Sequence, residues 1–178
     1  MPGPTPYSRL ATERLTLRPL ILADAAPMTT LLNDFDIARM VSRVPYPYAL
    51  DDARAYLAHL QNADPTRKRV FALESGPNGL IGVIGLDPSI DGDVTELGYW
   101  LGRPFWGHGY MTEAVSAVLK WARGEWGRRY LVAGHFADNP RSGRVLTKAG
   151  FLYTGDVRQR QSLARGEPVS SRLMVWLA

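Results

Sequence analysis

The junction between an expected strand and an expected helix carries the clearest chemical signal in this sequence. Residues 96–114 read ELGYWLGRPFWGHGYMTEA, with Gly107 and Gly109 placed just before an amphipathic run. Glycine tolerates positive φ and lets a ligand come close to the backbone. The first turn of a helix adds unpaired N–H groups and the positive end of the helix dipole. This order of elements predicts a site for a phosphate or pyrophosphate group.

A tight turn is the plainer interpretation of the two glycines, and two nucleotide motifs are excluded. The dinucleotide fingerprint G-x-G-x-x-G would need glycine at position 112, where the chain has Thr112. An NTPase phosphate loop would need Gly-Lys followed by Ser or Thr, and no such run follows Gly109. The residues alone therefore indicate an anion site without naming the ligand.

Regular hydrophobic spacing predicts the elements on either side of this junction. Residues 95–101 alternate as a strand does, so one face is expected to carry Leu97, Tyr99 and Leu101 and the other Glu96, Gly98 and Trp100. After the glycines, apolar residues recur with the period of a helix packed on a sheet, at Met111, Ala114, Val115, Val118, Leu119 and Ala122.

Further elements follow from the same patterns along the rest of the chain. Strands are expected at 14–20, 70–74, 80–86, 130–136, 151–157 and 171–176, and helices at 24–33, 51–63 and 139–149. Their mixed order predicts one α/β domain with a mixed sheet, spanning residues 1–178. Residues 1–8, rich in Pro and Gly, are expected to form a flexible tail.

Composition narrows the class of protein. The 178 residues include no cysteine, and the three histidines show no metal-ligand spacing, so neither disulfides nor a metal site are expected. No run approaches the roughly 18 uncharged apolar residues of a membrane span, and the first residues lack the apolar core of a secretory signal. We therefore expect a soluble cytoplasmic protein.

Positive charge is concentrated near the end of the sequence. Residues 139–178 hold seven basic and two acidic side chains, within a net charge of +4 for the chain. Such a charge run is most often a solvated face, and it can also attract a polyanionic ligand such as a nucleotide-containing cofactor. Nucleic acid is not an expected partner, because the aromatic and basic signatures of RNA-binding modules are missing.

Four motifs follow one another along nearly the whole chain. They are T-E-R-L-T-L-R-P-L at 12–20, P-Y-P-Y-x-L-D-D-A at 45–53, E-L-G-Y-W-L with P-x-W-G-H-G-Y-x-T-E-A at 96–114, and N-P-x-S-x-R-V-L-x-K-A-G-F at 139–151. Together they resemble the GNAT superfamily of N-acetyltransferases, and within it the Rim-type branch that includes ribosomal-protein-alanine N-acetyltransferases. The resemblance implies a mostly antiparallel sheet of about seven strands, a V-shaped splay between two central strands, and about four flanking helices.

The resemblance also implies acetyl-coenzyme A (acetyl-CoA) as cosubstrate, without a metal. In this family the loop before the central helix binds the coenzyme's pyrophosphate through its backbone, which maps here onto Trp106, Gly107, His108, Gly109, Tyr110 and Met111. The preceding strand, at Tyr99, Trp100 and Leu101, would pair with the pantetheine arm as an added strand does. Asn139 would lie near the pantetheine, and Arg144 or Lys148 near the phosphates.

Acetyl transfer to an amine needs a base for the amine's proton and an acid for the departing thiolate. Glu96 is the candidate base, with Glu74 as a weaker one. Many family members have a tyrosine acid where this chain has Leu146, so that role does not carry over, and Ser142 is the substitute, as an acid or as a relay through water. The structural alternatives are a surface carboxylate for Glu96 and a helix-capping serine for Ser142.

The sequence leaves the acceptor open. The residues fit two kinds of acceptor: a protein N-terminal amine, or a small amine such as an amino acid, polyamine or drug. They also fit a different class of protein, a CoA-binding domain with little catalysis. Monomer and homodimer are both compatible with the resemblance.

Overall fold

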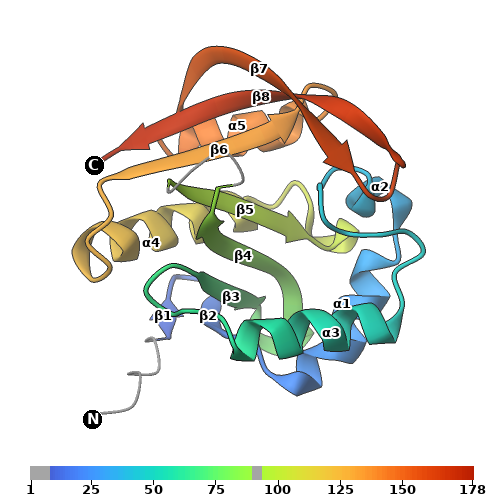
Figure 1. The fold of residues 1–178 in the computed structure, drawn as a ribbon. Helices are drawn as coiled ribbons and strands as arrows, with labels where there is room; N and C mark the ends of the chain where they lie inside the picture. The colour runs from blue at the N-terminus through green and yellow to red at the C-terminus, as the bar shows by residue number, and fades with distance from the viewer. Residues whose placement is uncertain (1–8, 90–93) are drawn as a thin grey trace.

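The computed structural model describes residues 9–89 and 94–178, and its strands form one eight-stranded sheet in the order β1-β2-β3-β4-β5-β6-β8-β7 (Figure 1). The tail expected at 1–8 lies outside the described residues. The strands are β1 (Leu10–Ala11), β2 (Thr16–Pro19), β3 (Arg69–Glu74), β4 (Leu80–Pro88), β5 (Thr95–Leu101), β6 (Tyr130–Phe136), β7 (Leu152–Ser162) and β8 (Glu167–Leu177). The helices are α1 (Ala25–Leu32), α2 (Phe35–Ala38), α3 (Leu50–Gln61), α4 (Tyr110–Gly124) and α5 (Pro140–Lys148), with 3-10 turns η1 (Leu22–Asp24), η2 (Gly76–Asn78) and η3 (Arg103–Phe105).

The predicted fold class is confirmed, and the differences lie in elements that carry no hydrophobic period. β1 has two residues and α2 has four, too few for a repeating pattern. α2 depends instead on the Asp34 side chain, which accepts a hydrogen bond from the Asp36 N–H. β7 and β8 extend beyond the expected 151–157 and 171–176. Their additional residues are mostly polar, and β7 is exposed along nearly its whole length, so hydrophobic spacing did not reveal the added length.

The sheet is split between β5 and β6. All neighbouring strands are antiparallel except this pair, which is parallel and is joined only where Glu96 pairs with Val132 and Leu97 with Ala133. Beyond these positions β6 diverges from β5, as Figure 1 shows toward its right-hand side. The divergence is the V-shaped splay that the resemblance implies, and it leaves one side of β5 without a strand partner from Gly98 onward.

Two hydrophobic cores cover opposite faces of the sheet. One packs α4 against the sheet and includes all six apolar residues of the predicted stripe, together with Leu97. The other packs α1 and α3 against the opposite face, and Trp100 lies against it. The predicted alternation of β5 is therefore correct. Within the described parts of the chain, no helix is long and apolar enough to cross a membrane.

Candidate active site

The glycine loop lies directly at the N-terminus of α4. Gly107 and Gly109 have φ values of +81° and +80°, and Gly109 is the N-cap residue of the helix, with no side-chain cap. A Cβ atom added at Gly107 would meet no described atom within 4 Å. Uncapped N–H groups, the dipole of a 15-residue helix and open space above the loop suit an anionic group bound by the backbone.

An N-terminal segment braces this loop from the side. The Arg14 guanidinium donates to the His108 carbonyl at 2.8 Å and to Glu113 Oε2 at 2.7 Å, while Thr12 Oγ1 donates to Glu113 Oε1 at 2.6 Å. Arg14 also lies 4.6 Å from the centre of the Tyr110 ring. Sequence reasoning missed this brace, although Thr12, Arg14 and Glu113 all stand within the quoted motifs.

Glu113 should stabilise the loop mainly above acidic pH. Burial alone would raise the pKa of Glu113, but hydrogen bonds from Thr12, the Arg14 N–H and the Arg14 guanidinium outweigh it and hold the pKa below its ordinary value. The contribution of Glu113 to the free energy of unfolding is therefore present above its pKa in the unfolded chain. It is lost as pH falls through its pKa in the folded protein.

We expect Glu113→Gln to lower the free energy of unfolding by about 0.5–1 kcal/mol at pH 7, since the pair is partly exposed. This difference in the free energy of unfolding should shrink as pH falls through the folded pKa of Glu113. Urea unfolding of both proteins, at pH 7 and at a pH below that folded pKa, measures the difference. Glu13→Gln, at an exposed position, is the control and should have no effect. A deficit that is equal at both pH values would contradict the assignment.

Trp106 closes the end of β5 next to the loop. Its indole Nε1 donates to the Leu101 carbonyl at 2.7 Å, so this carbonyl already has a partner. The guanidinium groups of Arg103 and Arg141 lie 5.6 Å and 5.3 Å from the centre of its ring. Arg103 also pairs with Asp34 and Asp36 of the α2 segment. The carbonyl of Leu101, one of the three predicted β5 residues, is therefore occupied by a side chain of the protein itself.

A hydroxyl pair spans the splay. The Tyr99 side chain on β5 lies with its Oη 2.9 Å from Ser142 Oγ in the first turn of α5, and the same hydroxyl is 3.2 Å from the Ser142 carbonyl. The Ser142 N–H donates to Asn139 Oδ1, the N-cap of α5, at 3.3 Å. Burial raises the pKa of Tyr99 well above its ordinary value, so its hydroxyl keeps its proton at neutral pH. Three predicted site residues are thus brought together.

The other predicted residues of α5 divide between solvent and core. Arg144 and Lys148 are exposed and lie one helical turn apart. Leu146 is 1% exposed and belongs to the core beneath α4 and α5. The position of the family's tyrosine is therefore a packing position in this chain.

Glu96 lies at the start of the splay and is held by an arginine from β7. Arg160 Nη1 donates to Glu96 Oε1 at 2.6 Å, and the two side chains are 15% and 13% exposed. The weaker candidate, Glu74, lies on β3 and pairs with Arg18, two strands away from β5. Glu96 is the candidate base that the fold places beside the splay.

A buried histidine next to the hydroxyl pair was missed by sequence reasoning. His135 Nδ1 donates to the Phe136 carbonyl at 2.9 Å, and its Nε2 lies within hydrogen-bond distance of the Tyr153 hydroxyl, at 2.9 Å. A Cβ at Gly143 would lie 2.5 Å from Tyr153 Oη and 2.8 Å from His135 Nε2. The close approach of α5 to these two side chains explains the glycine in its first turn.

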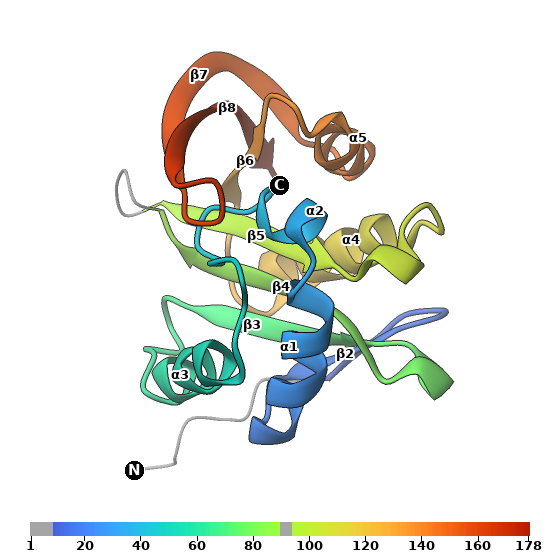
Figure 2. The same ribbon diagram turned by 90° about the vertical axis from the view of Figure 1, so that its right-hand side faces the viewer.

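The β7–β8 hairpin continues the sheet beyond β6, and Figure 2 shows it bending over β5 toward α2. At its tip Arg165 donates to Asp138 at 2.8 Å and 3.0 Å and to the Arg39 carbonyl at 2.8 Å. The Leu163 N–H donates to the Ser42 carbonyl at 3.1 Å. These contacts hold the hairpin against the segment that follows α2 and against the connection between β6 and α5.

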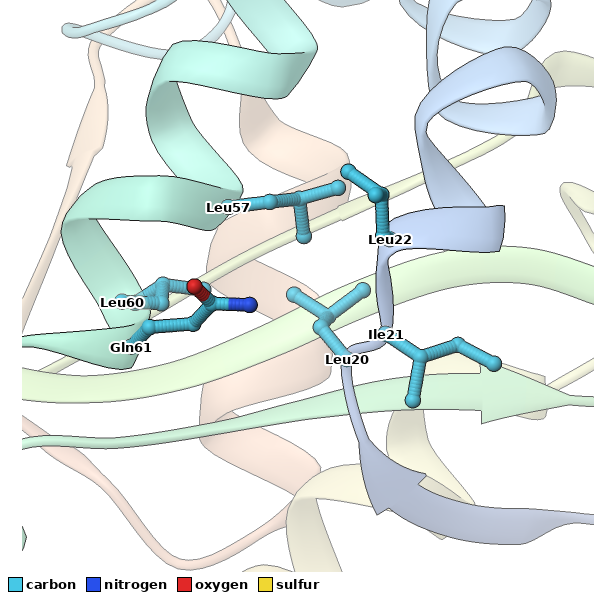
Figure 3. Close-up of a pocket in the computed structure, with 6 residues that line it drawn as sticks. All are labelled: Leu20, Ile21, Leu22, Leu57, Leu60 and Gln61. Atoms are coloured by element: carbon cyan, nitrogen blue, oxygen red, sulfur yellow. The ribbon is translucent and has the colours of Figure 1, made fainter.

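A small apolar pocket lies elsewhere, between η1 and α3. Its volume is about 90 Å³, and Figure 3 shows Leu20 and Leu22 directed toward Leu57 and Leu60 while Ile21 points away. Ligand pockets usually have volumes of about 300–1,000 Å³. This pocket is far from the glycine loop in sequence and too small for a nucleotide-sized ligand. Among the described residues, no group of three or more His, Asp or Glu side chains could hold a metal ion.

The fold, the glycine loop and the splay together define an acetyltransferase. Residues 14–152 match the family described as "Acetyltransferase (GNAT) domain". The chain therefore belongs to the GNAT acetyltransferase family, as its motifs predicted.

Individual relatives agree with this assignment. The uncharacterized N-acetyltransferase YoaA of Bacillus subtilis is 26% identical over 154 residues, covering 84% of this chain and 86% of that protein. The ribosomal-protein-serine acetyltransferase of Escherichia coli is 33% identical over 86 residues, covering 47% of this chain and 48% of that protein, which agrees with the predicted Rim-type branch. MccE, a microcin self immunity acetyltransferase solved with acetyl-CoA and AMP, has the same fold, with a TM-score of 0.79 at 18% identity over 94% of both chains.

Proposed function

We propose that this protein transfers an acetyl group directly from acetyl-CoA to a primary amine, with a protein N-terminus as the first candidate acceptor. The observation that carries the proposal is the position of the glycine loop at the N-terminus of α4, beside a splay that leaves β5 unpaired from Gly98 onward. The name of the ribosomal-protein-serine acetyltransferase relative supports a protein acceptor. A small amine is the alternative acceptor.

The glycine loop, β5 and α5 would each bind a different part of acetyl-CoA. The backbone of Trp106–Met111 would bind the pyrophosphate, and Gly107 leaves room for it. The backbone of Tyr99 and Trp100 would hydrogen-bond the amide-rich pantetheine, with Asn139 near its end. Arg144 and Lys148, exposed on α5, would meet the remaining phosphates.

The candidate proton-transfer groups take opposite roles. Glu96 would accept a proton from the acceptor's ammonium group, directly or through water, so that the neutral amine can attack the thioester. Ser142, hydrogen-bonded to Tyr99, would direct a hydroxyl proton toward the departing sulfur. Serine alone is a poor acid, and the neighbouring Tyr99 hydroxyl supplies a second proton within hydrogen-bond distance. The chain contains no cysteine, which agrees with transfer without a cysteine-bound intermediate.

Acetyl-CoA should stabilise the protein and be consumed in the presence of an amine. At 100 times the dissociation constant the gain is about 2.7 kcal/mol, or roughly 5–10 °C in Tm for a chain of this size. Amide hydrogen exchange of residues 106–111 should slow, and release of free thiol should follow addition of N-terminal peptides. Binding without turnover on peptides or small amines would favour a coenzyme-binding domain, and the absence of both binding and protection would refute the proposal.

A further inference from the structure

A glycine in the middle of β5 has no local reason to be glycine. Gly98 lies in an interior strand between β4 and β6, yet it is exposed. Its φ is not positive, and a Cβ built there would meet no described atom within 4 Å. Glycine inside a strand costs about 0.5–1 kcal/mol relative to alanine. The space above Gly98 is therefore open, on the face of β5 that carries Glu96 and Trp100.

Arg160 brings positive charge to this space. It reaches Glu96 from β7, which lies three places from β5 in the sheet order, because the hairpin bends over the sheet (Figure 2). The hairpin is basic, with four arginines and one glutamate between residues 158 and 172. At its tip Arg165 is already matched by Asp138. Arg160 contacts the candidate base Glu96 directly.

The ion pair has a consequence for the chemistry. The Glu96 oxygen that would receive the proton already accepts a hydrogen bond from the Arg160 guanidinium, at 2.6 Å. A second anion beside Arg160 would compete for the guanidinium, whose planar fork binds carboxylates in two-pronged fashion. An acceptor that carries its own negative charge next to its amine would supply that anion.

We propose that the space above Gly98 binds an amine with an anionic group a few bonds away, and that Arg160 binds this group. The inference rests on the proposed acetyl transfer. Glu96 is then released to take one proton from the ammonium nitrogen, after which the N–C bond forms and the C–S bond breaks. The nitrogen gives up its second proton as the amide forms, and the thiolate takes one proton. The carboxylate of a free amino acid and an acidic side chain beside a peptide N-terminus share this chemistry.

Matched acceptors test the inference with the full-length protein at saturating acetyl-CoA. The amidated peptides Ser-Asp-Ala-Ala and Ser-Asn-Ala-Ala differ by one charge, as do alanine and alaninamide, and the two pairs separate peptide from amino-acid acceptors. We expect kcat/KM to favour the charged member of at least one pair by about tenfold or more. Equal values within both pairs would overturn the inference while leaving the proposed function in place.

Variants then locate the effect. Arg160→Gln should reduce the preference to near unity, and Arg160→Lys, which keeps the charge but not the fork, should retain part of it. Arg54→Gln removes a charge from the exposed face of α3 and should leave kcat/KM unchanged for the charged and the uncharged acceptor. Gly98→Leu should raise the acceptor KM with an unchanged dissociation constant for acetyl-CoA. A preference that survives Arg160→Gln in a folded variant would overturn the inference, whereas failure of every acceptor would overturn the proposed function as well.

Discussion

Replacing Glu96 with glutamine should lower kcat by about 100- to 1,000-fold while the dissociation constant for acetyl-CoA stays within about twofold. Glutamine keeps the shape of the side chain but cannot take a proton from the ammonium group. Raising the pH should partly restore the rate, because more of the free amine is then neutral in solution. Steady-state kinetics between pH 7 and pH 9, with isothermal titration of acetyl-CoA, measure both quantities.

The chain offers a matched control for this variant. Glu74→Gln also removes the carboxylate of an arginine–glutamate pair, but on β3, so it should change stability without changing kcat. Ser142→Ala and Tyr99→Phe remove the hydroxyl pair and should have smaller effects on kcat than Glu96→Gln, since water can still protonate a thiolate. Equal kcat values for the Glu96→Gln and Glu74→Gln variants would remove Glu96 from the role of base.

Substituting Gly107 with alanine should weaken acetyl-CoA binding by about 10- to 100-fold, the loss expected when one backbone hydrogen bond to a charged group is displaced. The added methyl group would occupy the open space in which we place the pyrophosphate. The positive φ at this position would also strain the loop by about 1–2 kcal/mol. Isothermal titration separates the effect on binding from the effect on stability.

Gly127 is the control for that strain. It too is exposed, has a positive φ of +68° and has no described atom within 4 Å of a built Cβ, but it lies in the connection between α4 and β6. Gly127→Ala should therefore lower Tm about as much as Gly107→Ala and leave acetyl-CoA affinity unchanged. Comparable losses of affinity in the two variants would mean that strain, rather than displacement of a bound phosphate, explains the result.

Features with a local period could be predicted from the sequence. The stripe of α4, the alternation of β5 and the glycine loop between them each depend on residues within about a dozen positions of one another. The pairing of Tyr99 with Ser142 was not predicted as a contact, although both residues were chosen. Their proximity follows from the splay, which depends on how β6 leaves β5 and not on either local pattern.

Contacts between distant segments could not be predicted in this way. Arg160 meets Glu96 across 64 positions, and Arg14 meets Glu113 across 99. Charged residues on exposed strands leave no periodic signal, so neither the reach of β7 over β5 nor the brace of the loop can be recognised from local spacing. The His135–Tyr153 contact also joins two different strands, 18 positions apart, and local spacing does not reveal it. Only the glycine at position 143 hints at the crowding there.

The alternation of β5 also organises the direction of proton movement. Glu96 and Tyr99 stand three positions apart on one strand, so their side chains project from opposite faces of the sheet. In the proposed reaction the group that receives a proton and the group that supplies one are separated by the strand itself. The proton taken from the amine and the proton given to the departing sulfur are therefore handled by side chains on opposite faces of the sheet.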